Sequence, residues 1–449
     1  MRRHFYLAIC LAAVAIGACS KDSSLPLATG KGSIRAINAI STSPDFSILI
    51  EERGIGTAAY KAMSLPVDYD DLDYDFNFEI LMPGGTAPTR VATRHLDVVK
   101  DMGYTFIITG AISNPTILLW ETAQREFLAT DTVFEAQFGH TSPSLAAIDI
   151  FFAAPGIVPT SGAELGTLTF GDVLPVADYE AGDYVVIYTA AGNPGTVLFT
   201  SNTLSIAATA TRLFSVFDTD ANDLAPVAVQ LLDLSSGASA PIADVSYAPT
   251  LRFLHASISV GPVDIYIEDP LGEPAVSGHA FGEFTGDIAA SAGTVPLTYT
   301  AALNVGAILI DKDIVVAAGS HNQYYVIRSS AGEDVVVDYR PNRRSIETLA
   351  RISVINTSTN HPLVDFYAIT AGIGIADELP ILSSLSLDGD PIPFSVVAGD
   401  LDLYLTTPGE KTVLAGPVPI TAALGDVIEF IAYDNVDPAI VDLVFVPQP

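Results

Sequence analysis

The chain has 449 residues, a formal net charge of −32 and only two cysteines, Cys10 and Cys19. A surface this acidic repels nucleic acid and anionic lipid headgroups, which argues against both as partners. Beyond the N-terminal segment there is no run of 18 or more apolar residues, so the sequence predicts no transmembrane helix.

The N-terminus has the layout of a secretory signal. Arg2 and Arg3 precede an apolar run over residues 5–16. A short basic segment, about a dozen apolar residues and then small residues are typical of a cleaved signal peptide, and the run is too short to span a bilayer. We therefore predict that residues 1–18 are removed. Cys10 leaves with them, so the mature chain can form no internal disulfide bond.

Cys19 follows small residues in the sequence Ile-Gly-Ala-Cys over residues 16–19. This sequence resembles the lipobox of bacterial lipoproteins. The resemblance implies lipidation of Cys19 and anchoring in the bacterial cell envelope, and Ser20 resembles the pattern retained in the outer membrane. Several acyl chains, at roughly 0.8 kcal/mol per buried methylene, would hold the protein on the membrane. An ordinary cleaved signal stays open as the alternative. Residues 19–31 are polar and indicate a flexible tether.

Four stretches of the remaining chain are variants of one another. Each places one polar side chain nine residues before a second one, and an alternating apolar strand follows. The first polar positions are Asn38, His140, His255 and Asn356, and the second are Ser47, Asp149, Asp264 and Asp365. Because the stretches lie roughly 100 residues apart, each repeat is large enough to be a domain with its own core.

Each repeat consists of short apolar segments separated by Gly, Pro, Asn and Asp, and each ends in a predicted hairpin. This pattern predicts a β-sandwich rather than a barrel or a βαβ unit, and no segment keeps a helical period over three turns. The expected units are residues 32–128, 129–241, 242–344 and 345–449. The basic stretch at residues 341–345 is expected to be a hinge or a protease-sensitive point.

A short motif is most complete in the third and fourth repeats. It consists of Asn or His followed by Ala or Thr and Ser, then Val-Asp-Ile/Phe-Tyr, then Ala-Gly before a strand; it covers residues 255–257, 263–266, 292–293, 356–358, 364–367 and 398–399. The first two repeats depart from it, at Ser47 and Phe151. The motif resembles the bacterial domain-of-unknown-function 4397 family. The resemblance implies four tandem immunoglobulin-like antiparallel β-sandwiches on an exported protein and carries no established activity.

His140, Ser142 and Asp149 have the residue types of a base, a nucleophile and an acid. The first and fourth repeats, however, have asparagine where the histidine stands. Asparagine cannot accept a proton near neutral pH, whereas both side chains can donate a hydrogen bond. We therefore predict no catalytic residue. The structural hydrogen-bond anchors that we predict are Asn38, His140, Asp149, His255, Asp264, Asn356 and Asp365.

Acidic residues cluster in two places. Over residues 73–79 they alternate with aromatic residues, which predicts a strand with one charged and one apolar face. In the second cluster, Asp218, Asp220 and Asn222 offer oxygen atoms that could converge on calcium, but an Asx-rich turn without an ion explains the same pattern. We expect no cofactor and keep calcium at these three residues as the alternative.

These observations predict a non-enzymatic cell-envelope lipoprotein that acts as a surface interaction or spacer module. Its partners would be the membrane, through the lipid, and an unidentified envelope protein or glycan, without nucleic acid. Joined end to end, four such units would project roughly 100 Å or more. The alternative is a glycan- or small-ligand-binding lipoprotein that uses loops of the third and fourth units, with Tyr266 and Tyr367 as candidate contacts.

Overall fold

The computed structural model describes residues 27–82, 85–339, 342–387, 389 and 392–446, and all regular structure within them is β-strand. None of the described residues forms a helix able to cross a membrane. The predicted signal peptide and the lipidated Cys19 lie outside these residues. The prediction of an all-β chain built from sandwich-like sheets is confirmed, since the strands form eight sheets of four or five strands in the described part.

The sheets face one another in four pairs, which we call modules 1 to 4 in chain order, and each pair encloses an apolar core of its own. Module 1 contains β1 (Lys31–Asn38), β2 (Phe46–Ile50), β3 (Arg53–Ala58), β4 (Val67–Asp70), β5 (Asp73–Leu81), β6 (Pro88–Asp97), β7 (Met102–Ala111) and β8 (Asn114–Ala123). Module 2 contains β9 (Val133–His140), β10 (Ile148–Ala153), β11 (Gly166–Leu168), β12 (Ala177–Glu180), β13 (Gly182–Ala190), β14 (Asn193–Thr200), β15 (Leu204–Ile206), β16 (Thr211–Phe217), β17 (Ala228–Asp233) and β18 (Ser239–Ile242).

The second half of the chain repeats this plan. Module 3 contains β19 (Thr250–His255), β20 (Val263–Ile267), β21 (Val276–His279), β22 (Ile288–Ala289), β23 (Gly293–Ala301), β24 (Asn304–Val316), β25 (His321–Arg328) and β26 (Asp334–Tyr339). Module 4 contains β27 (Ala350–Asn356), β28 (Leu363–Thr370), β29 (Leu382–Ser386), β30 (Phe394–Val396), β31 (Gly399–Thr406), β32 (Val413–Ala422), β33 (Val427–Asp434) and β34 (Val441–Val446).

One strand order recurs in every module. In module 1 the sheets run β4-β1-β7-β8 and β3-β2-β5-β6, and modules 3 and 4 have the corresponding orders. The first strand of each module pairs in parallel with a strand from the second half of the same module, as β1–β7, β9–β16, β19–β25 and β27–β33. Hydrophobic periodicity does not predict this parallel pair, because its two strands lie far apart in the sequence and the pattern of each strand is local.

Module 2 adds strands to this plan. β18 pairs with the outer edge of β17, and β15 pairs with β13. The expected boundary between residues 241 and 242 falls inside β18. Pro241 makes the segment read as a loop, although proline is tolerated at a sheet edge, where its missing N–H is not needed.

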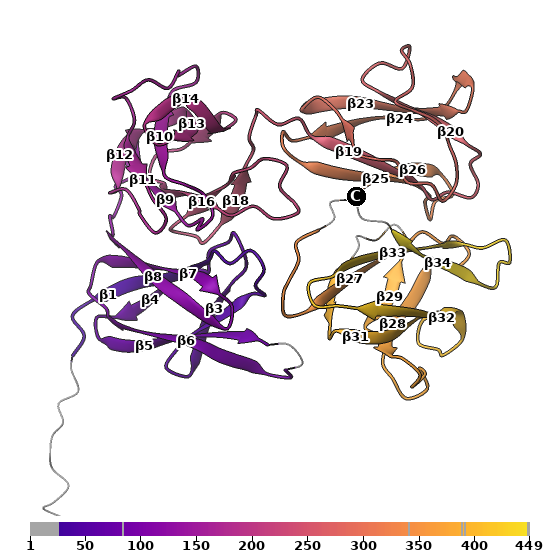
Figure 1. Cartoon of the computed structure of the whole chain (residues 1–449), viewed down its shortest axis with the longest axis horizontal. Coiled ribbons are helices and arrows are strands. Elements are labelled where there is room, and N and C mark those ends of the chain that lie inside the picture. The colour runs from indigo at the N-terminus through magenta and orange to yellow at the C-terminus, as the bar shows by residue number, and fades with distance from the viewer. Residues whose placement is uncertain (1–26, 83–84, 340–341, 388, 390–391, 447–449) are drawn as a thin grey trace, which may run out of the picture.

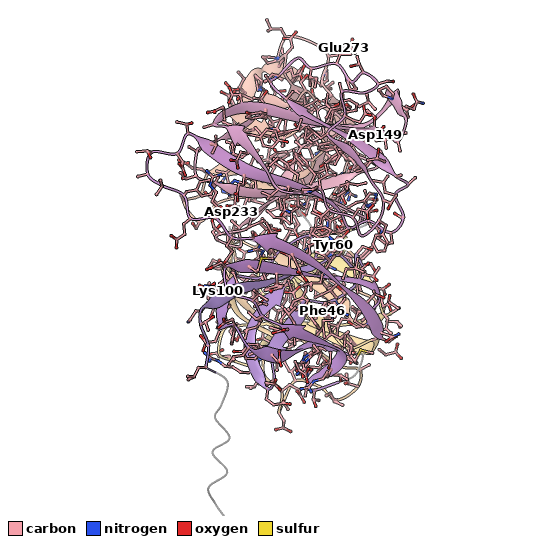
Figure 2. All side chains as sticks on the ribbon, turned by 90° about the vertical axis from the view of Figure 1, so that its left-hand side faces the viewer. Phe46, Tyr60, Lys100, Asp149, Asp233 and Glu273 are labelled. Carbon is pink, nitrogen blue, oxygen red and sulfur yellow. The ribbon has the colours of Figure 1, made fainter. Side chains whose placement is uncertain are left out.

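The first strand of each module is buried on both faces. In β1, for example, residues 32–38 are all buried. Ala36 points into the core of module 1, whereas Ile37 belongs to a second apolar cluster shared with module 2. Modules 1 and 2 therefore pack back to back through the outer faces of the sheets that hold the parallel pairs. Figure 2 places Tyr60 at the level of this seam, between Phe46 of module 1 and Asp149 of module 2.

Trp120 fixes the seam between modules 1 and 2. Its ring lies against the backbone of Gly139 on β9, so closely that a Cβ added there would lie 2.4 Å from the indole. Its Nε1 donates to the carbonyl oxygen of Gly171, 2.8 Å away in module 2. Arg35 crosses the same seam to the carbonyl oxygen of Leu234 at 3.1 Å, and burial lowers the pKa of Arg35 to about 10.

Modules 3 and 4 pack against each other in the same way. Leu254, Tyr325 and Ile327 of module 3 form one apolar cluster with Ile355 and Ile431 of module 4. The carboxylate of Glu429 accepts hydrogen bonds from the Tyr325 hydroxyl and the Gln323 amide across this seam. The chain thus forms two back-to-back pairs, and Figure 1 shows the pairs side by side, in a two-by-two arrangement rather than an extended row.

A side chain at position 139 should separate modules 1 and 2. We expect Gly139→Val to cost about 1–3 kcal/mol of stability, because the added atoms overpack the seam against Trp120. The emission of Trp120, the only tryptophan in the chain, should shift to the red as the seam opens to water. Gly195→Val, at an exposed position, is the control. An unshifted spectrum and unchanged unfolding midpoint would contradict the described packing.

Candidate functional site

The first polar position of each repeat sits at the end of the module's first strand and is fully buried. Asn38, His140, His255 and Asn356 are at most 1% exposed. Each lies within hydrogen-bond distance of a carbonyl oxygen in the loop that leads to the second strand: Pro44 at 3.3 Å, Ala146 at 3.3 Å, Gly261 at 3.1 Å and His361 at 3.0 Å. The side chain therefore bridges the first strand and the approach to the second.

Asparagine and histidine can share this position because each can place one N–H on that carbonyl oxygen. The contact requires the proton of His140 to be on Nε2, and its Nδ1 is buried without a hydrogen-bond partner in the described residues. Burial lowers the pKa of both His140 and His255, so the neutral ring is favoured. A neutral, buried ring whose N–H is already used is a structural group.

The second polar position binds two hairpins at once. Asp264 accepts hydrogen bonds from the backbone N–H of Gly278 at 2.7 Å and of Leu303 at 2.9 Å. Asp365 accepts from Ser384 and Gly409 in the same way, and Asp149 from the Thr167 hydroxyl and the Gly192 N–H. These carboxylates lie on the second strand of their modules, and each one binds the neighbouring edge strand (β11, β21 or β29) and the turn between the other two strands of the sheet. Module 1 has Ser47 there and lacks this clasp.

A third set of residues was not predicted from the sequence. The Ser257 hydroxyl donates to Asp334 at 2.7 Å, and Ser358 donates to Asp434 at 2.5 Å. In module 2, Ser142 makes the same contact with Asp218. Each aspartate lies beside the last hairpin and caps the loop after the first strand. The signal in the sequence is a serine two residues after the anchor, paired with an acid some 75 residues later.

These contacts separate the three residue types that resembled a catalytic set. In module 2 the His140 ring reaches the Ala146 carbonyl, Ser142 reaches Asp218, and Asp149 reaches Thr167 and Gly192. Ser142 is therefore bonded to Asp218 and not to the His140 ring, so these three residues do not form a serine–histidine–aspartate set.

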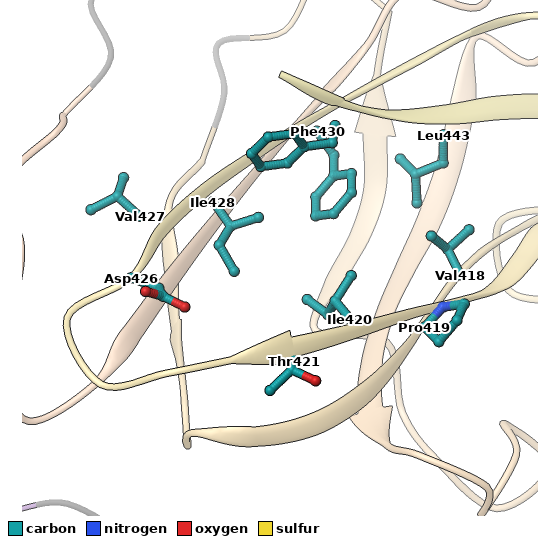
Figure 3. A pocket seen from close by; sticks show the side chains of 10 residues that line it. Val418, Pro419, Ile420, Thr421, Asp426, Val427, Ile428, Phe430 and Leu443 are labelled. Atoms are coloured by element: carbon teal, nitrogen blue, oxygen red, sulfur yellow. The ribbon is translucent and has the colours of Figure 1, made fainter. Parts of the chain in front are cut away.

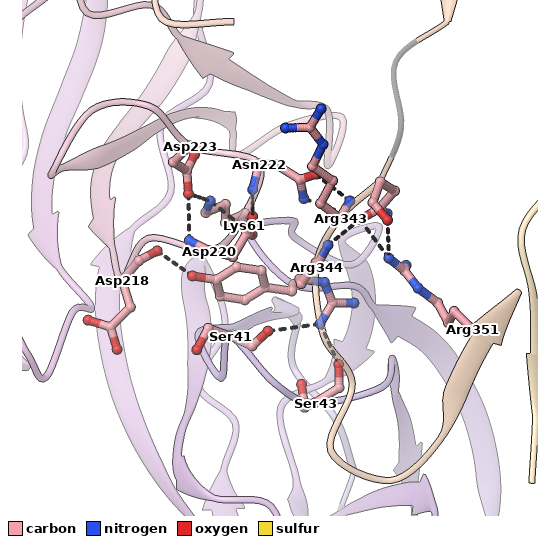
Figure 4. Close-up of polar contacts among 12 residues, drawn as sticks. Ser41, Ser43, Lys61, Asp218, Asp220, Asn222, Asp223, Arg343, Arg344 and Arg351 are labelled. Carbon is pink, nitrogen blue, oxygen red and sulfur yellow. Dashed lines mark hydrogen bonds and ion pairs between the residues drawn. The ribbon is translucent and has the colours of Figure 1, made fainter. Parts of the chain in front are cut away.

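The side chains of the three residues proposed for calcium have different partners, and Figure 4 shows the three residues at the joint with Lys61 and Arg344. Asp218 accepts a hydrogen bond from Ser142, Asp220 forms an ion pair with Lys61 of module 1 at 3.2 Å, and the Asn222 amide donates to Asn342. In the described part of the chain, no group of three or more His, Cys, Asp or Glu side chains could hold a metal ion. The acidic loop instead forms part of the joint between the two pairs of modules.

The basic stretch before module 4 is the other half of this joint. Arg344 is 8% exposed and donates to the carbonyl oxygens of Ser41 at 3.1 Å and Ser43 at 2.6 Å, both in module 1. The guanidinium also lies over the Tyr60 ring, 5.3 Å from its centroid. The side-chain oxygen of Asn342 accepts a hydrogen bond from the Arg351 guanidinium, and the backbone N–H of Arg343 donates to the side-chain oxygen of Asn222 in module 2. The prediction of a hinge or a protease-sensitive point at residues 341–345 is therefore wrong at Arg343 and Arg344, because both side chains are buried and Arg344 is bonded to module 1.

The tyrosines considered for glycan binding are also buried. Tyr266 is 6% exposed and Tyr367 is 2% exposed, and the Lys411 ammonium covers the Tyr367 ring at 4.9 Å from its centroid. They cannot form an aromatic platform for a sugar. In an alternating strand the tyrosine after Val-Asp-Ile or Val-Asp-Phe faces away from its module's core, and only the tertiary arrangement covers it.

Comparison with known proteins identifies one part of the chain. Residues 249–367 match the family described as Domain of unknown function (DUF4397). This segment belongs to that family. The match covers module 3, the first strand of module 4 and most of the second, and it contains the anchors His255, Asp264, Asn356 and Asp365. The predicted family is thus confirmed for the third repeat and the beginning of the fourth.

Two solved structures are distantly similar. The Bacillus anthracis TIE protein is 8% identical, with 87% of this chain and 66% of that chain covered and a TM-score of 0.16. CBMbc, a family CBM26 domain of Eubacterium rectale Amy13K in complex with maltoheptaose, is 10% identical over 44% of this chain and 95% of that chain, with a TM-score of 0.15. At these scores neither carries an argument about function. No curated protein matches the chain.

Replacing His140 by the asparagine of the other repeats should remove a pH dependence. Burial places the pKa of folded His140 below its ordinary value of 6.5, so the unfolded state binds more protons as the pH falls through that value. The histidine's contribution to stability is thus complete above about pH 7 and is lost towards the folded pKa. His140→Asn should keep the bridge to Ala146 and weaken the difference in unfolding midpoint between pH 7.5 and 5.5. Trp120 fluorescence in urea measures it, and equal differences in both proteins would contradict the assignment.

Removing Arg344 should loosen the joint. Arg344→Ala deletes two buried hydrogen bonds from a charged donor, each worth about 1.5–3 kcal/mol. We expect the two pairs of modules to move apart, with a larger radius of gyration in small-angle scattering and new cleavage by trypsin near residue 343. Arg94→Ala, at an exposed arginine, is the control. An unchanged radius would show that the joint does not hold the pairs together.

Proposed function

We propose that this protein is a membrane-anchored component of the bacterial cell envelope whose four modules form a rigid block for surface interaction or spacing, without catalysis. The observation that carries the proposal is the use of the shared polar residues. The side chains that recur in the modules are buried and bonded within their own module, as with His255 and Asp264. The side chains that the modules share stabilise the fold, and in this proposal partners bind the surfaces in which the modules differ.

The packing supports a rigid block. Two apolar seams and a buried polar joint connect the modules, and packed interfaces of this kind open less readily than an exposed linker. The net charge of −32 supports association with basic partners, because a surface of one sign attracts and steers the other. The proposed attachment rests on Cys19 after three lipobox-like residues.

The attachment is tested by changing the cysteine. In cells that make lipoproteins, the natural chain should partition into the detergent phase and label with a palmitate analogue, and Cys19→Ala should lose both properties. Cys10→Ala, within the predicted signal, is the matched control and should behave as the natural chain. If Cys19→Ala still resists extraction by salt and carbonate, the protein is not a lipoprotein.

The interaction half is tested on the same cells by cross-linking. The anchored chain should cross-link to an envelope protein or glycan in a salt-sensitive manner, whereas the released Cys19→Ala chain should not. Cross-linking to nothing would leave a spacer role and would contradict the interaction role.

A further inference from the structure

In module 4 a groove opens between the edges of the two sheets. The edge strands β32 and β34 leave a groove of about 590 Å³, within the range typical of binding pockets (Figure 3). Its lining is apolar except at one end, and it includes Val418, Ile420, Ile428, Phe430, Leu443, Phe445 and Asp426. Phe445 is 50% exposed, which is unusual for a phenylalanine beside a core.

In module 2 a strand of the module itself fills the equivalent space between the sheet edges. β17 corresponds to β34 in strand order, and β18 pairs along its outer edge, with Ile242 opposite Val229. Ile242 is 7% exposed and belongs to the core of module 2. The chain then crosses to the other sheet, where Val245 donates to the Thr200 carbonyl oxygen at 2.9 Å. One extended segment thus closes the space between the sheet edges of module 2 and hydrogen-bonds to both sheets.

Module 4 has no such strand among its described residues. In the register of the two modules, Leu443 corresponds to Val229 and Phe445 to Leu231, because they pair with equivalent residues of β33 and β16. Leu231 is flanked by Ala240 of β18, whereas no described strand pairs with the outer edge of β34. The sequence of β34, Val-Asp-Leu-Val-Phe-Val, carries neither the lysine nor the proline that commonly protects an exposed edge.

We infer that the groove of module 4 receives a β-strand from another envelope polypeptide, which pairs with β34 and places an apolar side chain beside Leu443. The inference rests on the proposed interaction role and locates it. Asp426 is the only charged residue in the lining, and in the register of β18 the N-terminal end of the strand lies nearest to it. The strand therefore carries a lysine or arginine at that end. The charge of −32 disfavours a second copy of this chain as the donor.

The probe is a fluorescent peptide with the sequence of residues 238–245, Ala-Ser-Ala-Pro-Ile-Ala-Asp-Val, preceded by a lysine. Anisotropy measures its binding to the chain without residues 1–19. We expect saturable binding and protection of β34 amides from hydrogen exchange. Phe445→Asp should weaken binding at least tenfold and Asp426→Asn by a few fold. Val436→Asp, a 93% exposed valine in the turn of the same hairpin, should have no effect.

A second peptide keeps the test valid if Phe445→Asp does not fold. With aspartate in place of its isoleucine, the peptide should bind the natural chain at least tenfold more weakly. No binding at up to about 1 mM, or equal binding of both peptides, would overturn the inference. So would a groove that takes an apolar dye or a second copy of the chain and leaves the peptide unbound. If the peptide does not bind but membrane attachment depends on Cys19, the inferred strand-binding site is wrong and the proposed function still stands.

Discussion

Burial of one sheet on both faces is the constraint on which the rest of the structure depends. The sheet with the parallel pair has the module's core on one side and the neighbouring module on the other, so even polar residues on its central strands, such as Arg35 and Gln323, are buried. Buried polar groups need hydrogen-bond partners. Arg35 reaches across the seam to a carbonyl group, and Gln323 reaches Glu429. The seams therefore combine apolar contact with polar contacts that fix how the modules align.

The same constraint explains the residues at the strand ends. Where the first strand leaves its sheet, the backbone turns inside the molecule, and a buried side chain must bind the carbonyl group that water would otherwise solvate. Asparagine in modules 1 and 4 and histidine in modules 2 and 3 do this equally well. The carboxylate on the second strand, as in Asp365, accepts hydrogen bonds from an N–H of strand β29 and from an N–H in the turn between β31 and β32. These groups are thus bonded within their own modules.

The modules differ in features that bear on the proposed function. Module 1 has Ser47 in place of the bridging aspartate, and module 2 covers its own sheet edge with β18. The linker before module 4 brings Arg344 into contact with module 1. The joint holds two pairs in a fixed relation, which suits a block that presents particular edges outward. The open edge of β34 is one of these: it pairs with no described strand on its outer side and lies next to an apolar groove, which favours recognition of extended polypeptide.

The sequence alone determined the all-β class, the four-fold repeat and the family of residues 249–367, because alternation and turn residues are local and a repeated motif can be read without a structure. It also identified Asp264 and His255 as bridging candidates from the asparagine in other repeats. Only the tertiary structure decided the parallel pairs, the buried Tyr367 and the buried Arg344. Each of these depends on which module covers which face, and no local pattern of residues encodes the contact between strands that lie far apart in the chain.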